Sequence, residues 1–149
     1  MFDFEQWLYS IIASDSTLTA LLTTSDSAVS LNVFPAGVDI QPENFPCITY
    51  QDAGTILDSV KRMYTGKMQV DIWSKINMQE IMTIYTELAT LIDFQHTRIS
   101  PVSVPDSTIL WWIREETTSD RPDTTRRLWR KIVTFKYWAS DPRLQVNPL

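Results

Sequence analysis

The sequence contains little of what most catalytic sites require. Its 149 residues include one histidine, His96, and three glycines. With a single histidine, a metal site built from two histidines of the same chain is excluded. None of the glycines falls in GxGxxG or GxxxxGK spacing, so the sequence offers no phosphate-binding loop. We therefore predict no catalytic residue, no metal site and no cofactor, and we do not expect an enzyme.

Cysteine is equally scarce, because Cys47 is the only one. It cannot form a disulfide within the chain, and a reducing, cytosolic site of folding is the economical interpretation. Cys47 follows Pro46 at the start of a predicted strand, and nothing nearby in sequence would lower its pKa. A buried, unreactive thiol is predicted. The chain has no apolar run of the ~20 residues that cross a bilayer, and no signal peptide is visible at its start.

Basic residues are absent from the first sixty positions. All charged residues in that part are acidic, and they are Asp3, Glu5, Asp15, Asp26, Asp39, Glu43, Asp52 and Asp58. All thirteen Lys and Arg residues come later, and the net charge is −5. The two parts can pair internally, which is the favoured interpretation, or offer faces of opposite sign to other copies of the chain. The net acidity disfavours nucleic acid as the main ligand.

The clearest pattern covers residues 67–92. Met68, Val70 and Ile72 alternate with polar or aromatic residues, as in a strand with one buried face. Asn77 and Glu80 then have the spacing of a capping box. The helix that follows is predicted to bury one apolar stripe, formed by Met78, Ile81, Met82, Tyr85, Leu88, Ala89 and Ile92. A strand joined so closely to a helix indicates a helix packed back on a sheet.

The remaining elements complete an α+β pattern in the order α-β-β-β-α-β-β. An N-terminal helix extends into a further turn capped by Asp15 or Ser16. Strands are predicted at residues 29–35, 47–53, 109–117 and 128–139, in addition to the strand that begins at Lys67. We expect a mainly antiparallel sheet of four to five strands with two helices on one face. The last two strands carry bulky apolar residues on both faces, so their second face is also expected to be covered, either by a helix or by another subunit.

Two polar segments are predicted to be mobile connections, at residues 54–66 and 115–127. Residues 93–107 carry Pro101 and Pro105 and predict a loop or an edge strand. Glu115 and Glu116 are adjacent and would point to opposite faces of a strand, so they cannot act as an acid/base pair. The chain is predicted to form one domain over residues 1–141, followed by a loosely held tail at 142–149.

These motifs, in this order, resemble the tail completion or tail terminator proteins of long-tailed bacteriophages, the small α+β family that includes lambda-type tail terminators. The resemblance covers most of the chain. Its parts are LYSIIASDSTLTALL, NVFPAG, FPCITYQDAG, GKMQVDIWS, NMQEIMTIYTELATLIDF and RRLWRKIVTFKYWA. The connection TILDSVKRMYTG and the prolines of residues 93–107 depart from the family pattern.

The resemblance implies a structural virion protein that forms a ring, typically of six copies, at the head-proximal end of the tail tube. Such a ring stops tube growth and provides the surface that joins head and tail. The implied partners are other copies of the chain, the tail tube protein and a head-tail connector, while genomic DNA passes through without specific binding. Assembly would occur in the host cytoplasm and the protein would reside in the virion.

A ring of identical copies needs heterologous interfaces, in which one face meets a different face of the next copy. The charge order and the polar segments predict subunit or partner contacts at Asp58, Lys61, Arg62, Arg121, Asp123, Arg126, Arg127 and Arg130. Two alternatives stay open. One is a head-side adaptor or connector subunit of the neck, and the other is a small soluble enzyme or adaptor domain that shares the α+β order.

Overall fold

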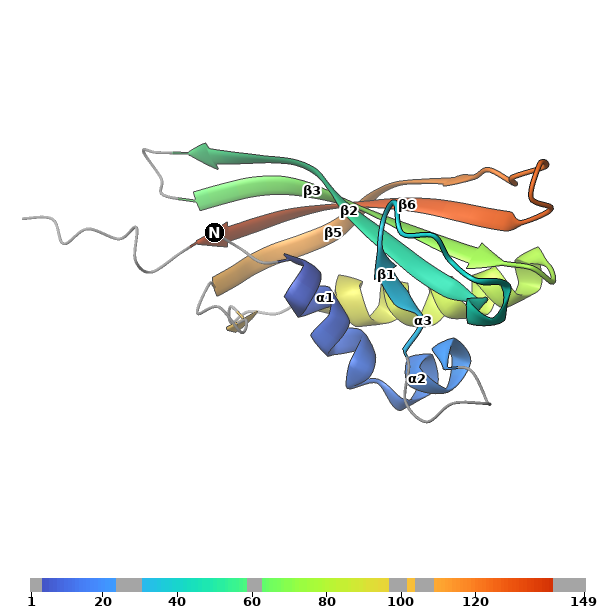
Figure 1. The fold of residues 1–149 in the computed structure, drawn as a ribbon. Helices are drawn as coiled ribbons and strands as arrows, with labels where there is room; N and C mark the ends of the chain where they lie inside the picture. The colour runs from blue at the N-terminus through green and yellow to red at the C-terminus, as the bar shows by residue number, and fades with distance from the viewer. Residues whose placement is uncertain (1–3, 24–30, 59–62, 97–101, 104–108, 141–149) are drawn as a thin grey trace, which may run out of the picture.

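A computed structural model describes residues 4–23, 31–58, 63–96, 102–103 and 109–140 of the chain (Figure 1). The helices are α1 (Phe4–Ala13), α2 (Ser16–Leu22) and α3 (Met78–His96), with one 3-10 turn at Pro42–Asn44. The strands are β1 (Val33–Pro35), β2 (Cys47–Asp58), β3 (Met63–Ser74), β4 (Val102–Ser103), β5 (Ile109–Asp120) and β6 (Trp129–Ser140). The predicted tail at 142–149 lies outside the described residues.

The strands form one sheet in the order β1-β2-β3-β6-β5-β4. All neighbours are antiparallel except β1 and β2, which run parallel. The three helices lie beneath one face of this twisted sheet (Figure 1). The predicted α+β class is confirmed. The predicted N-terminal helix is divided into α1 and α2, and the outermost strands β1 and β4 are short.

Both polar segments predicted as mobile connections belong largely to paired strands. Residues 54–58 pair with residues 63–67, and residues 115–120 pair with residues 131–135. The prediction of long mobile segments at 54–66 and 115–127 is therefore wrong. Polarity indicated mobility because the segments have little to bury, but an antiparallel partner satisfies the backbone N–H and C=O groups whatever the side chains are.

Strict alternation divides the sheet into a helix-covered face and an outer face. Met68 and Val70 of β3 lie opposite Phe135 and Val133 of β6, and all four are buried beneath the helices. The residues between them point away from the helices, toward the outer face. No described helix covers the second face of β6, since Trp138 is 46% exposed in the single chain, and cover by another subunit stays a prediction.

Helix starts follow the predicted caps. Asp15 accepts a hydrogen bond from the backbone N–H of Leu18 at 3.0 Å, and Asn77 accepts one from the N–H of Glu80 at 3.0 Å. The second half of the predicted capping box differs, because the Glu80 carboxylate accepts a hydrogen bond from the Ser74 hydroxyl at 2.8 Å. No helix that the structure describes is long and apolar enough to cross a membrane.

The buried stripe of α3 is rotated from the predicted one. Its fully buried members are Ile81, Ile84, Leu88 and Ile92, whereas Met82 is 39% exposed. The predicted stripe does not include Ile84, because Met82 and Tyr85 also satisfy a 3.6-residue period. The choice between them is made by the sheet, against which only one side of the helix packs.

Candidate functional site

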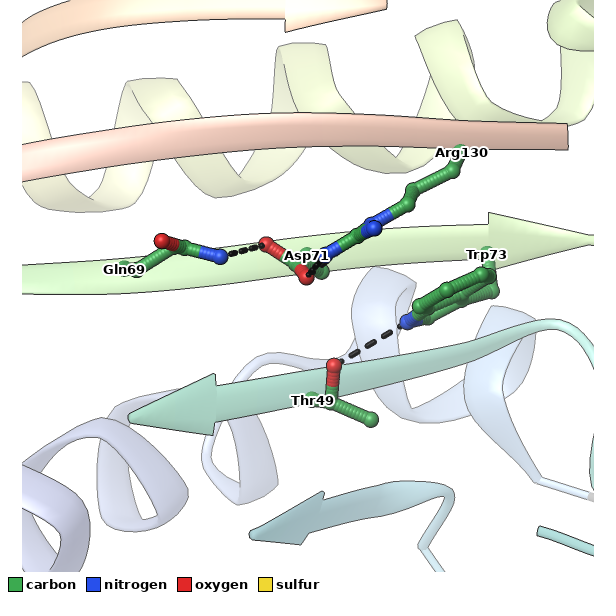
Figure 2. Close-up of polar contacts among 5 residues, drawn as sticks. All are labelled: Thr49, Gln69, Asp71, Trp73 and Arg130. Atoms are coloured by element: carbon green, nitrogen blue, oxygen red, sulfur yellow. Dashed lines mark hydrogen bonds and ion pairs between the residues drawn. The ribbon is translucent and has the colours of Figure 1, made fainter. Parts of the chain in front are cut away.

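A cluster of polar and aromatic side chains joins β2, β3 and β6 on the outer face (Figure 2). Arg130 donates from Nε to Asp71 Oδ2 at 3.1 Å, and its Nη2 also binds that oxygen. Gln69 donates to the other Asp71 oxygen at 3.0 Å. Trp73 donates from Nε1 to the Thr49 hydroxyl at 3.0 Å, and the Arg130 guanidinium lies 4.6 Å from the centre of its ring.

The ion pair at the centre of this cluster is part of the fold. The side chain of Asp71 is 7% exposed and that of Arg130 is 28% exposed. Removing one partner of a buried pair leaves an uncompensated charge and costs about 3–5 kcal/mol. Arg130 is one of the predicted contact residues, yet its guanidinium is committed to its own chain. A test of assembly should therefore leave Arg130 unchanged.

A cleft of about 390 Å³ opens above the cluster. The connection between β1 and β2 forms one wall, and the β5–β6 connection forms the other. The described residues that line it are Ala36, Gly37, Val38, Asp39, Ile40, Phe45, Thr49, Gln51, Asp71, Trp73, Asp123, Arg126, Leu128 and Arg130. The structure thus brings three of the predicted contact residues, Asp123, Arg126 and Arg130, to one place.

A second hollow of about 320 Å³ adjoins the cleft, and we call it the basic groove. Apolar side chains and cations share its lining, which consists of Ile40, Pro42, Phe45, Lys75, Arg126, Arg127 and Leu128. No acidic side chain that the structure describes lines it. The exposed Ile76 follows Lys75 directly in the chain.

The tip of the β5–β6 hairpin is held in shape by local hydrogen bonds. Asp123 and Leu128 exchange backbone bonds of 2.8 and 3.0 Å. The Asp123 carboxylate accepts from the N–H groups of Thr125 and Arg126, both at 3.1 Å. Arg127 has φ of 57°, in the left-handed region that side chains with a Cβ rarely adopt. These contacts fix the place from which Arg126 and Arg127 extend.

The other predicted contact residues lie elsewhere. Asp58 ends β2 and pairs with Met63, at the opposite end of the sheet from the basic groove. Lys61 and Arg62 lie outside the described residues. Arg121 is exposed on the same hairpin as Arg126, and its N–H bonds the Arg130 carbonyl at 2.9 Å. These assignments stay predictions.

Several ion pairs form within the later, mixed-charge part of the chain. Lys67 pairs with Glu116 at 3.1 Å, and the buried Lys131 pairs with Asp120 at 3.0 Å. Beneath the sheet, the Tyr85 hydroxyl lies 2.6 Å from a Glu115 oxygen. Glu115 thus binds a residue of α3 while Glu116 binds one of β3, as expected for neighbours that point to opposite faces.

Two carboxyl groups meet where α2 begins beside α3. The carboxyl group of Glu87 lies close to that of Asp15, and the pKa of Glu87 is raised. Partial burial is the main cause, and the neighbouring Asp15 adds to it through its charge and through hydrogen bonding with Glu87 in the protonated form. Among the described residues, no ion pair involves either carboxyl group. We call these two residues the acid pair.

Sequence reasoning missed the acid pair and the partners of Arg130. The alternation of β3 does place Gln69, Asp71 and Trp73 on one face. The alternation does not reveal the register between β3 and β6, which places Arg130 opposite Trp73. In the part of the chain that the structure describes, no group of three His, Cys, Asp or Glu residues is arranged to hold a metal ion.

Comparison with known proteins identifies a similar fold but no sequence family. No family model matches the sequence, and no curated protein does. Among solved structures, the chain is similar to one in the virion of a native gene transfer agent (GTA) particle. The TM-score is 0.67 with 12% identity, over 92% of this chain and 94% of that one. At this identity the likeness shows the fold.

Proposed function

We propose that this chain is a structural virion protein that acts as a tail terminator, forming a ring at the head-proximal end of a tail tube. The observation that carries the proposal is the likeness to a virion chain over 92% of this sequence and 94% of the other. A match that spans nearly the whole of both chains leaves little room for an unrelated domain in either. The motif order of the sequence, which resembles tail terminators, supports the same assignment.

The proposed partners are further copies of the chain, the tail tube protein and a head-tail connector. The cleft and the adjoining basic groove form one surface of the molecule, and the helices beneath the sheet present a different one (Figure 1). A ring of identical copies requires such different surfaces on each copy. Genomic DNA would pass the ring without specific binding, because a net charge of −5 gives no general attraction to phosphates. No catalytic step belongs to this function.

Deleting the gene in the particle-producing host tests the proposal. Without a terminator, tube subunits continue to add, so electron micrographs should show overlong tubes and filled heads without tails. Supplying the intact gene on a plasmid should restore tails of normal length. Tails of normal length with a defect confined to the head would contradict termination and favour the head-side adaptor. Particles of normal form and number would exclude both virion roles.

A further inference from the structure

The basic groove and the acid pair suit each other, but they lie in different parts of the molecule. We propose that, in the ring, the basic groove of one copy receives the acid pair of the next, with Arg126 and Arg127 facing Asp15 and Glu87. This contact rests on the proposed ring and names the surfaces that build it. Each copy would use its groove toward one neighbour and its acid pair toward the other.

The groove carries cations that its own chain leaves largely uncompensated. The side chain of Arg126 is 68% exposed, and its Nε lies 3.9 Å from Asp123, at the limit of an ion pair. Among the described residues, no ion pair involves Lys75 or Arg127. Ile40, Pro42, Phe45 and Leu128 line the same groove, so its surface is partly apolar. A partner with carboxylates on a partly apolar surface fits such a site.

The conformation of Arg127 adds to this argument. A residue with a Cβ at φ of 57° costs free energy that glycine or asparagine would avoid. Backbone strain of this kind is typical of positions that a function requires. Here the strained residue is Arg127, whose guanidinium extends from the tip of a hairpin that local hydrogen bonds hold in shape.

Within the described part of the chain, the acid pair lacks a cationic partner, just as the basic groove lacks a close anionic one. The Asp15 carboxylate accepts the capping hydrogen bond from the N–H of Leu18, which holds it at the start of α2 beside Glu87. A cation from outside would stabilise both carboxylates at once. Beside Asp15 lies a hollow lined by Ser10, Ile11, Ser14 and Leu91, of about 270 Å³. Its hydroxyls and aliphatic groups suit the stem and the donors of an arginine side chain.

The arrangement of elements makes this a contact between copies. The junction of α1 and α2 lies below the sheet, and the β5–β6 hairpin lies at one end of it (Figure 1). When two complementary surfaces occupy different places on a molecule, their contact is heterologous and repeats from copy to copy. When the repeated contact brings the last copy back to the first, the copies form the closed ring of the proposed function.

Charge reversal on the purified full chain tests the contact. The variants are Arg127→Glu, Glu87→Arg and the two combined, and mass photometry or sedimentation velocity reports ring formation. Each single reversal should raise the concentration needed for assembly about tenfold or more, because like charges then meet. The combined variant should recover most of the loss. Circular dichroism should show each variant folded.

Lys136→Glu is the matched control, because Lys136 lies on β6 of the same hairpin, is not among the predicted contact residues and does not line the groove. It should leave assembly unchanged. An equal loss with Lys136→Glu, or no recovery in the combined variant, would overturn the groove contact. If the wild type forms rings and both single reversals do so equally well, the contact fails and the ring stands. If the wild type stays monomeric even beside tail-tube subunits, the proposed function itself fails.

Glu87→Gln separates folding from assembly should a reversal disturb the fold. Folding raises the pKa of Glu87, so the native state loses stability as pH rises from the ordinary value of 4.5 toward the raised one. The amide removes this loss. At neutral pH the variant monomer should unfold at a higher temperature than the wild type, while its rings form less readily. Rings that form more readily in Glu87→Gln would contradict the proposal.

Discussion

At the scale of single residues, Gly66 shows how closely the sheet is packed. It lies opposite Tyr137, and a Cβ added to it would come within 2.3 Å of the Tyr137 ring. The aromatic ring thus occupies the space that a side chain on β3 would need. Glycine is required here by this close approach, since its φ is not positive.

Gly66→Ala should therefore destabilise the protein by about 1–3 kcal/mol, the usual cost of overpacking. The direction of this change in the free energy of unfolding is informative, because replacing glycine by alanine ordinarily stabilises a strand. Urea unfolding measures the change. Combining Gly66→Ala with Tyr137→Leu should cost less than the sum of the two single changes. Strict additivity would show that the ring does not meet the new methyl group.

Cys47 is buried, as predicted, and burial raises the pKa of its thiol from 9.0 to about 12. The folded state binds this proton more tightly than the unfolded state does. Its contribution to stability is therefore complete below pH 9 and is lost as pH rises from 9 to about 12. The thiol should also remain protonated and unreactive at neutral pH.

Iodoacetamide at pH 8 should alkylate Cys47 slowly in the native protein and rapidly in urea. In Cys47→Ala, the decline of stability between pH 9 and 12 should be shallower than in the wild type, which isolates the thiol from other groups that titrate there. Rapid alkylation of the native protein would contradict the burial of this side chain.

At the scale of elements, the strands and helices follow their sequence patterns closely. The boundaries of β6 differ by one residue at each end from those predicted, and β1 ends at Pro35 as predicted but begins only at Val33. The main error concerns β2 and β5, which extend through polar residues that predicted mobile connections. Their neighbours β3 and β6 supply hydrogen bonds along the whole length, and solvent on the outer face accepts the polar side chains. Local composition does not reveal this support.

The start of α3 depends on Asn77, whose side chain satisfies the N–H of Glu80. Asn77→Ala should destabilise the protein by about 1 kcal/mol, as at other helix N-caps. Asn77→Ser is the matched control, because its hydroxyl can accept the same hydrogen bond, and it should stay close to the wild type. Thermal unfolding followed by circular dichroism measures both. Equal stability of all three proteins would mean that Ser74, which bonds the N–H of Ile76 at 3.0 Å, suffices as a cap.

At the scale of the whole molecule, the helices cover one face of the sheet and leave the other open. Apolar side chains on the open face include Ile56, 73% exposed, and Trp138. Uncovered apolar groups and separated charges both favour association, but they respond to salt in opposite ways. Salt dependence therefore tells which of them dominates between copies.

Because the proposed contact between copies is ionic, raising NaCl from 0.15 to 1 M should weaken assembly, as the screening length falls from about 8 to about 3 Å. Mass photometry over this range measures the effect, with the monomer's thermal unfolding as the control for folding. Assembly that strengthens with salt would assign the contact to the apolar residues of the outer face.

The sequence by itself determined the local structure of this protein. The α+β order, the caps at Asp15 and Asn77 and the burial of Cys47 follow from periodicity and side-chain chemistry within a few residues. Only the tertiary structure decided which distant groups meet. Arg130 and Asp71 are 59 residues apart, and Asp15 caps α2 whereas Glu87 belongs to α3. Such pairs depend on strand register and helix packing, which the summed burial of the whole core sets and no local pattern encodes.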